Sequence, residues 1–398
     1  MSDAENLPLS GLRVLDLTTT VFGPYTTQIL GDFGADVIKI EAPGGDTLRN
    51  VEPSRSPGMG AVFLGTNRNK RSVLLDLKQE NAREALWQLV DGADAFIHNM
   101  RPQKIADLGF GAQTVMARNP RIIYTDLLGY LPEGPYGGRP AYDDVVQGEC
   151  GFAATFAARD GAPVLAPSVV VDKNAALIAV NGIMAAFLQR ARTGKGVHVE
   201  AGMFEGLAAY NLVEHQYGTI FSPPEGPPGY PRVLSANRKP FATRDGYICM
   251  LPYTDKQWRS FWRIAGQPER ADDERFATMS ARSKNIDLIY AEAGKILAAR
   301  TSDQWLELLA DADIPAGRVN DFDDLRSDPH LNAIGFYRAY DHPSEGALEV
   351  PDTGYRIDGN TLPIRRHQPQ LGEHTRDVLL EAGVSPEAVN KICDASDA

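Results

Sequence analysis

Short apolar runs alternate with helix-like segments over the first third of the chain, and this alternation restricts the folds open to it. Leu12–Leu17 is apolar enough for a buried strand, and Val37–Ile40 is a second such run. Between them lies a helix-like stretch, residues 25–33, with Pro24 at its start and Gly34 just past its end, which is the usual punctuation of a helix. Strand, helix and strand at this spacing predict a βαβ unit with a right-handed crossover.

The same alternation continues to residue 127. We expect further strands at Ser72–Leu77, Ala95–His98 and Arg121–Leu127, and a helix at Asn81–Val90. Strands that are apolar throughout and separated by helices are typical of a parallel sheet covered on both faces. The sequence therefore predicts an α/β fold whose large domain is a Rossmann-like open parallel sheet.

A run rich in Pro and Gly, Ser222–Pro231, interrupts this pattern. A chain of 398 residues is long for a single core, so we place a domain boundary there. We expect residues 1–221 to form the first part of the large domain and residues 222–330 a smaller α+β domain. Residues 331–398 then return to the large domain.

The charge balance argues against nucleic acid as a partner. The formal net charge is −12 at pH 7, whereas phosphate neutralisation needs clustered Lys and Arg. The three cysteines, Cys150, Cys249 and Cys393, are far apart, so neither a disulfide framework nor a Cys-rich metal site is expected. The first residues are polar and no apolar run approaches about 18 residues, which predicts a cytoplasmic protein with no membrane partner.

The turn after the first strand lacks a dinucleotide fingerprint. Its glycines, Gly23, Gly31 and Gly34, do not have the G-x-G-x-x-G spacing. The turn still leads into the N-terminus of a helix, where exposed N–H groups favour an anion. An anion site and a plain βα turn both fit these residues.

Two groups of cations are candidates for phosphate binding. Asn67–Ser72 (NRNKRS) fits either a phosphate contact or a solvated charge run. Arg101 and Lys104 lie in the segment that leaves the carboxyl end of an expected parallel strand, where ligands of open α/β sheets bind. A surface loop with ordinary charges explains this second group equally well.

Asp172 stands at the N-terminal end of a long amphipathic segment, residues 172–192. A carboxylate in that position is most often a helix cap. It can also be a nucleophile that forms a covalent acyl intermediate, and nearby helix N–H groups would keep it ionised. No histidine spacing suits a metal and there is no G-x-S-x-G elbow, so neither a metal centre nor a serine hydrolase is expected.

Several segments together resemble class III CoA-transferases, the family that includes formyl-CoA transferase and carnitine CoA-transferase. The resemblance spans nearly the whole chain in the right order, and the joint pattern is specific although each segment alone is weak. The segments are LSGLRVLDLTTTVFGPYTTQILGDFGADVIKIEAPGGDTLRN, NRNKRSVLLDLK, HNMRP, GYLPEGPYGGRPAYDDVVQGECG, VVVDKNAALIAVNGIMAAFLQRARTGKGVHVEAGMFEG, IPAGRVNDFDDLRSDPHL and LGEHTRDVLLEAG.

The resemblance also implies which residues act. It places the catalytic aspartate on Asp172. It implies contacts to the adenine and phosphates of CoA from Val21, Lys70, Asn99, Met100 and Arg101. It implies that Gly129 and Tyr130 line the pantetheine and the thioester. It also implies that Met203 lies near the bound CoA. It further implies an interlocked homodimer, acyl-CoA and carboxylic acid substrates, no metal and no permanently bound cofactor.

The chain departs from the family at several positions. It has Ala42 and Asp107 where members carry Arg, and Leu128 where formyl-CoA transferase carries Lys. The glycine-run loop of formyl-CoA transferase is absent, with at most a short version at Gly226–Gly229. Phosphate binding must therefore use other cations, and oxalate as the acceptor is in question.

The implied reaction moves CoA from an acyl-CoA to a carboxylic acid through an aspartyl anhydride and an aspartyl thioester. One alternative is an α-methylacyl-CoA racemase, which needs a His and Asp pair, but the segment Ala141–Val146 has no histidine. A second alternative is a non-catalytic acyl-CoA-binding protein. Arg232, Arg238 and Lys239 suggest dicarboxylate substrates if their loop caps the site, and they fit a basic surface loop equally well.

Overall fold

The computed structural model describes residues 7–396, which form two compact units. The first unit contains the residues up to 150, residues 166–209 and those from 335 on. The second contains residues 151–165 and 210–334. The expected boundaries at 221/222 and 330/331 stay predictions; the compact units begin the second part twelve residues earlier, at Tyr210, and add to it the short segment 151–165.

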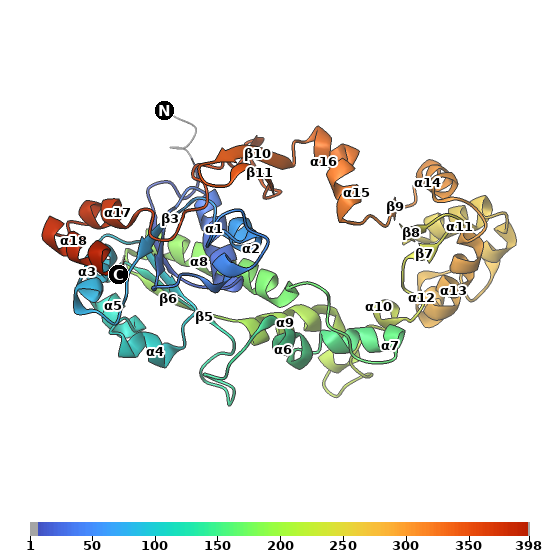
Figure 1. Ribbon diagram of the computed structural model, residues 1–398. Coiled ribbons are helices and arrows are strands. Elements are labelled where there is room, and N and C mark those ends of the chain that lie inside the picture. The colour runs from blue at the N-terminus through green and yellow to red at the C-terminus, as the bar shows by residue number, and fades with distance from the viewer. Residues whose placement is uncertain (1–6, 397–398) are drawn as a thin grey trace. The chain divides into compact units, whose positions relative to one another are not determined.

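The first unit is built on a six-stranded parallel sheet (Figure 1). The order of its strands is β3-β2-β1-β4-β5-β6, so the direction of winding reverses between β1 and β4. Ligands of doubly wound sheets bind outside the carboxyl ends of the strands at such a reversal. The expected α/β fold with a parallel sheet is confirmed. The strands are β1 (Arg13–Leu17), β2 (Asp36–Glu41), β3 (Lys70–Leu74), β4 (Ala95–His98), β5 (Ile123–Leu128) and β6 (Val197–Gly202).

The search for apolar runs finds five of these strands and misses β6. β6 lies at one edge of the sheet, where it pairs only with β5, and its first four residues alternate between half-buried and exposed. The central strands have neighbours on both sides and are buried along nearly their whole length. β3 lies at the other edge of the sheet and is nevertheless buried at four of its five residues, so the alternation within β6, and not its edge position alone, hides it from a search for apolar runs.

Helices cover both faces of the sheet (Figure 1). On one face α1 (Phe22–Asp32) packs against α8 (Val170–Thr193), and α8 also contacts β5 and β6. On the other face a single apolar core joins the sheet to Ile105 of the short helix α4 (Pro102–Asp107) and to four further helices. These are α3 (Glu80–Asp91), α5 (Ala112–Arg118), α17 (Thr375–Glu381) and α18 (Pro386–Ser396). The N-terminal strands and the C-terminal helices thus share one core, with Leu15 and Ile392 both buried in it.

By length and composition α8 is apolar enough to cross a membrane, and it is the one such helix among residues 7–396. Its most apolar window is 44% buried inside the protein, and it packs on α1, β5 and β6. These contacts are those of a core helix in a globular unit, so the apolar composition of α8 has an explanation that needs no bilayer.

The rest of the first unit consists of short elements. The helices are α2 (Ala61–Thr66), α4 (Pro102–Asp107), α6 (Asp143–Glu149) and the first half of α9 (Met203–His215). Two antiparallel hairpins pair β10 (Tyr337–His342) with β11 (Gly346–Pro351) and β12 (Arg356–Ile357) with β13 (Asn360–Thr361).

The second unit has its own antiparallel sheet and its own core. A three-stranded sheet is covered by helices whose tryptophans, Trp258, Trp262 and Trp305, are buried together. Two of these helices begin with a Thr-x-x-Gln capping box, at Thr254 and Thr301, which fixes their first residues. The elements are β7 (Phe241–Ala242), β8 (Tyr247–Met250), β9 (Ala316–Arg318), α7 (Ala157–Asp160), α10 (Pro231–Leu234), α11 (Asp255–Ile264), α12 (Met279–Lys284), α13 (Ile286–Leu297), α14 (Ser302–Asp311), α15 (Phe322–Ser327) and α16 (Pro329–Ala333).

Candidate active site

A cavity of about 260 Å³ lies in the first unit at the carboxyl ends of β1, β4 and β5, where the strand order reverses. Its walls come from the turn between β1 and α1, from the segments that leave β4 and β5, and from the start of α8. The residues that matter below are Thr19, Thr20, Asn99, Met100, Arg101, Gly129, Tyr130, Arg139, Tyr142, Asp172 and Met203.

Seven of the nine residues that the family resemblance selects line this one cavity, and two do not. The seven come from four segments that are far apart along the chain, so the fold brings them together. They are Asn99, Met100, Arg101, Gly129, Tyr130, Asp172 and Met203.

The turn after β1 is held in an unusual conformation. Thr20 has a φ of +71°, which is rare for a β-branched residue. Its N–H donates to the buried carboxylate of Asp46 (3.1 Å), and Asn99 clamps the preceding residue, accepting from the Thr19 N–H (3.1 Å) and donating to the Thr19 carbonyl (2.8 Å). The side-chain amide of Asn99 therefore stabilises this wall of the cavity through two hydrogen bonds to the backbone of Thr19.

Val21 and Lys70 lie outside the cavity. Val21 packs into a small apolar cluster with Leu48, Met59 and Phe63, next to the lining residue Thr20. Lys70 is fully buried, and its ammonium donates to Asp16 (3.0 Å), to the Pro24 carbonyl (2.9 Å) and to Asn67 (2.8 Å). These three bonds use all three ammonium donors. The expectation that Lys70 contacts a CoA phosphate is therefore corrected: its donors serve the interior of the fold.

The whole NRNKRS run follows the same pattern. Arg68 pairs with Asp32 (2.8 Å), and Arg71 pairs with Asp36 (2.6 Å) and Glu381 (2.8 Å). Arg68 and Arg71 are buried as well. The run is neither a phosphate site nor a solvated charge run, because each of its cations is taken up by a carboxylate within the first unit.

The loop that leaves β5 is fixed by close packing at Gly129. A Cβ at this position would lie 2.3 Å from the Cβ of Ala141, so only glycine fits there. The Gly129 carbonyl accepts from the Phe204 N–H (3.1 Å), and the Leu131 N–H donates to Glu205 (3.1 Å). The backbone of this loop is thus held against the start of α9.

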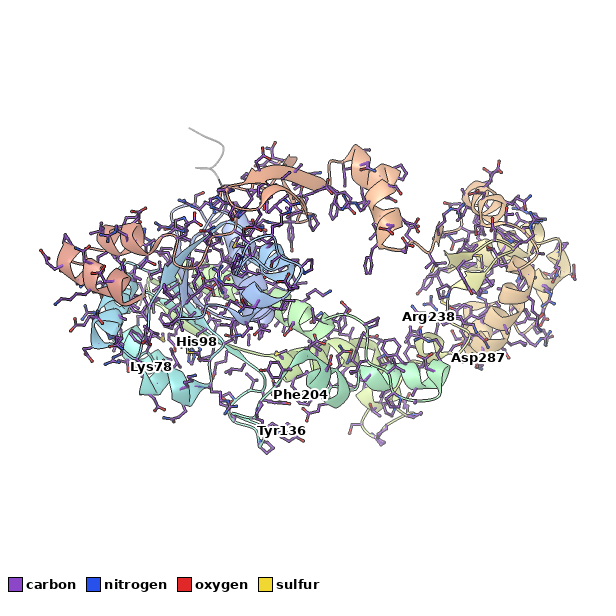
Figure 2. The ribbon with its side chains drawn as sticks, in the orientation of Figure 1. Lys78, His98, Tyr136, Phe204, Arg238 and Asp287 are labelled. Carbon is purple, nitrogen blue, oxygen red and sulfur yellow. The ribbon has the colours of Figure 1, made fainter. Side chains whose placement is uncertain are left out.

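Aromatic rings and one arginine stabilise the far side of the same loop. Tyr130, Tyr136 and Phe204 pack with ring centroids 5.6–6.1 Å apart, and Figure 2 shows Tyr136 on the loop beside Phe204. The Arg139 guanidinium lies over the Tyr136 ring at 4.5 Å and pairs with Glu149 (3.2 Å). Arg139 and Arg101 are the cations that line the cavity.

Asp172 is the one carboxylate that lines the cavity. It is the third residue of α8 and does not cap this helix. The cap comes from Asp143 of α6, whose Oδ2 accepts from the N–H groups of Val171 (2.8 Å) and Asp172 (3.0 Å). Asp172 is half-buried, with no hydrogen-bond or ion-pair partner for its carboxylate among the described residues.

This environment raises the pKa of Asp172 from 3.8 to about 6. Burial is the main cause, and the negative charge of Asp143 is the second. The expectation that helix N–H groups keep Asp172 ionised is wrong, because Asp143 occupies the two N–H groups nearest to it. The Asp172 carboxyl therefore holds its proton to a higher pH than an ordinary aspartate does.

Sequence reasoning missed Asp143 and Arg139. Both lie in the quoted segment GYLPEGPYGGRPAYDDVVQGECG, but nothing in it indicates that Asp143 caps a helix 29 residues away. No histidine among the described residues lines the cavity; the residue before Asp143 is Tyr142, which does.

A row of polar side chains crosses three strands away from the cavity lining. Asp126 on β5 lies between His98 (2.9 Å) and His198 (2.5 Å). Asp126, His198 and Glu200 form a group that could hold a metal ion. Its members lie up to 74 residues apart on neighbouring strands, so no sequence spacing marks it. The contacts that the structure records there are ion pairs and hydrogen bonds that join β4, β5 and β6.

The sequence of this chain matches CoA-transferase family III over residues 9–375. Curated relatives include a probable fatty acyl-CoA transferase of Mycobacterium tuberculosis, 36% identical over 316 residues (76% of this chain and 80% of the relative). Another is succinyl-CoA:glutarate CoA-transferase of Mus musculus, 32% identical (96% of this chain and 88% of the relative). Among solved structures, a CAIB/BAIF family protein from Brucella suis is 31% identical, with a TM-score of 0.80 over 95% of this chain and all of the other.

These matches, the parallel sheet and the cavity at its reversal point define the class of protein: the chain belongs to CoA-transferase family III. Its relatives are named as CoA-transferases, and the protein is an enzyme of that class.

Proposed function

We propose that this protein moves CoA from an acyl-CoA donor to a carboxylic acid acceptor, with the Asp172 carboxylate as the nucleophile. The observation that carries the proposal is the environment of Asp172. It is a carboxylate without a hydrogen-bond or ion-pair partner among the described residues, with a raised pKa, in the cavity where a doubly wound sheet binds ligands.

The first half-reaction releases the donor acid. The Asp172 carboxylate attacks the thioester carbonyl, which forms a mixed anhydride and expels CoA as its thiolate. The thiolate then attacks the Asp172 carbonyl of the anhydride. This gives an aspartyl-CoA thioester and frees the donor carboxylate.

The second half-reaction is the reverse with the new acid. The acceptor carboxylate attacks the aspartyl thioester, which forms a second mixed anhydride and expels the thiolate again. Attack of the thiolate on the acceptor carbonyl gives the new acyl-CoA and restores the Asp172 carboxylate. Every step forms an oxyanion, which the backbone N–H groups of Gly129 and Tyr130 would stabilise by about 3 kcal/mol per donor.

Dicarboxylates are the proposed substrate class. Relatives of this chain are named for succinate, glutarate and mesaconate. Arg101 and Arg139 line the cavity with Asp172 and give a second carboxylate two cations to bind. The earlier candidates, Arg232, Arg238 and Lys239, lie in the second unit, where Arg238 (labelled in Figure 2) and Lys239 line a separate cavity of about 540 Å³.

The remaining proposals follow the family resemblance. They are an interlocked homodimer, a Rossmann-like description of the large domain, a cytoplasmic location, and CoA thioesters as substrates without a permanently bound cofactor. Light scattering of the purified protein tests the dimer, which would be excluded by a single-chain mass.

Asp172→Ala tests the function directly. We expect the rate of CoA transfer from succinyl-CoA to glutarate to fall roughly a thousandfold or more, while CoA binding is kept. Asp144→Asn, which changes an exposed acid on α6, is the matched control and should transfer CoA at the normal rate. Full turnover by Asp172→Ala would exclude Asp172 as the nucleophile. Exchange of the α-proton without CoA transfer would instead indicate a racemase.

Arg139→Gln tests the substrate class. We expect KM for a dicarboxylic acceptor to rise roughly tenfold, since a charge-assisted hydrogen bond is lost. KM for a monocarboxylic acceptor should stay the same. An equal rise for both acceptors would mean that Arg139 supports the loop and does not select the substrate.

A further inference from the structure

Asp143 is a second buried carboxylate next to the proposed nucleophile. It is the first residue of α6, and its side chain is turned inward to the start of α8. One oxygen, Oδ2, accepts two N–H groups, from Val171 at 2.8 Å and from Asp172 at 3.0 Å. Val169, at the position where a helix usually provides its own cap, has no acceptor in its side chain. Asp143 thus supplies a cap that the sequence of α8 lacks.

The other oxygen of Asp143 is held by Gln147, which is fully buried. The Gln147 amide donates to Asp143 Oδ1 (2.5 Å), and its own oxygen accepts from the Ala166 N–H (2.9 Å). Both oxygens of Asp143 are therefore engaged by neutral N–H donors, and no ion pair to it is found among the described residues. The negative charge of Asp143 is oriented but not neutralised.

We propose that Asp143 is a positioning residue for Asp172, because it takes the N–H donors that would otherwise bind the Asp172 carboxylate and places an unpaired negative charge beside it. The inference rests on the proposed role of Asp172. An Asp at the third position of a helix normally benefits from the free N–H groups of the first turn. Here those groups already have a partner, so the lone pairs of Asp172 stay available for attack on a thioester.

The effect on reactivity has two parts. A carboxylate that accepts hydrogen bonds is a weaker nucleophile, because the bonds stabilise the charge that must be given up in the reaction. A neighbouring negative charge acts in the same direction, because it makes the carboxylate more basic. Asp143 supplies both parts, which agrees with its place as the second cause, after burial, of the raised pKa of Asp172.

Other charged and titratable groups around Asp172 are already paired or lie on the cavity wall. Arg139 pairs with Glu149, which also accepts from the Tyr130 hydroxyl, and the Lys173 ammonium donates to Ser168 (2.7 Å). Glu205 accepts from the Leu131 N–H. Arg101 and Tyr142 line the cavity wall, and Asp144 is exposed on α6.

The test compares two substitutions that remove the same charge from the same helix. Asp143→Asn keeps an oxygen that can accept the N–H groups of α8, whereas Asp144→Asn alters an exposed side chain. Wild-type kcat/KM should fall as the pH drops through about 6, where Asp172 takes up a proton. Asp143→Asn should move this acid limb to lower pH and reduce kcat several-fold, and Asp144→Asn should leave both unchanged. An acid limb of Asp143→Asn that coincides with wild type would overturn the proposal.

A second measurement does not depend on turnover or on a stable Asp143 variant. Carbodiimides modify protonated carboxyl groups, and mass spectrometry of peptides reports how far Asp172 is labelled at each pH. Labelling of Asp172 in the wild-type protein should have its midpoint near pH 6, well above that of exposed acids such as Asp144. A labelling midpoint in the pH range of the exposed acids would exclude an effect of the Asp143 charge on Asp172. If Asp172→Ala were still active, the proposed role of Asp172 as the nucleophile would fail, but the labelling midpoint of Asp172 in the wild-type protein would stay elevated. Failure of the proposed function is therefore distinguishable from failure of the inference about Asp143.

Discussion

Two carboxylates of the first unit, the fully buried Asp16 and the half-buried Asp172, have opposite environments. Burial alone would raise the pKa of Asp16, but Lys70, Lys39 and two threonine hydroxyls outweigh it and lower the pKa below 3.8. Asp172 has no such partner, so burial and Asp143 raise its pKa to about 6. The difference teaches that the partners, more than the depth of burial, separate a carboxylate that holds the fold together from one that is free to react.

The same contrast separates the cations. Arg68, Lys70 and Arg71 are buried in their ion pairs, whereas Arg101 and Arg139 are exposed residues that line the cavity, although Arg139 also pairs with Glu149. Cations that look alike in the sequence thus belong to two regions of the first unit, one where carboxylates of the fold pair with them and one that lines the cavity at the ends of β4 and β5.

Lys70→Ala should have the largest effect on stability. It leaves the Asp16 charge buried without the cation of its ion pair, and we expect the free energy of unfolding to fall by about 3–5 kcal/mol. Chemical denaturation measures this loss. Lys78→Ala, which removes an exposed lysine (Figure 2), is the matched control and should change stability by less than about 0.5 kcal/mol. A loss of under about 1 kcal/mol for Lys70→Ala would mean that the cluster contributes little to the fold.

Asp172→Asn should have the opposite effect on stability and increase the free energy of unfolding. The folded chain holds the Asp172 proton more tightly than the unfolded chain, so the ionised form destabilises the fold above about pH 6. Removing the charge should raise the free energy of unfolding at neutral pH by up to about 3 kcal/mol. This gain should shrink as the pH falls through 6 and vanish below about pH 4, where both states are protonated.

Denaturation curves at several pH values check this second prediction, with Asp144→Asn as the control for loss of one charge. If Asp172→Asn were less stable than wild type at neutral pH, Asp172 would be a stabilising residue like Asp16, and the comparison would fail.

Gly129→Ala should have the smallest effect on stability and act on the shape of the cavity. Its Cβ would meet Ala141 at 2.3 Å, so the loop must shift. We expect kcat/KM to fall roughly tenfold, in line with the about 1–3 kcal/mol that overpacking costs. The double variant Gly129→Ala with Ala141→Gly removes the clash and should recover most of the activity. If it does not, the shape of this loop is not what limits the single variant.

The fold could be predicted largely from the sequence, because the buried strands of a parallel sheet are apolar along their whole length. β4 is found at its observed bounds, Ala95–His98, and β1 and β2 to within a residue or two. β6 escapes because its first four residues alternate between half-buried and exposed and form no apolar run. The family resemblance reaches further, since seven of its nine residues meet in one cavity.

The remaining errors concern partners that only the fold brings together. The partner of Lys70 is 54 residues away on β1, so the sequence cannot distinguish an ion pair from a phosphate contact. The cap of α8 comes from Asp143 on another helix, so the sequence around Asp172 gives the wrong direction for its pKa. Local sequence predicts which helices and strands form. The ion pairs and pKa values of their side chains depend on residues that are distant in the sequence and close in the fold.

The most direct test of the account is to trap the aspartyl thioester. The protein is incubated with succinyl-CoA, treated with borohydride, which reduces a thioester to the alcohol, and digested for mass spectrometry. The account predicts that the modified residue is Asp172, that no modification occurs without an acyl-CoA, and that Asp172→Asn is not modified. Modification of a different carboxylate, or none despite measurable CoA transfer, would contradict the claim that Asp172 carries the CoA.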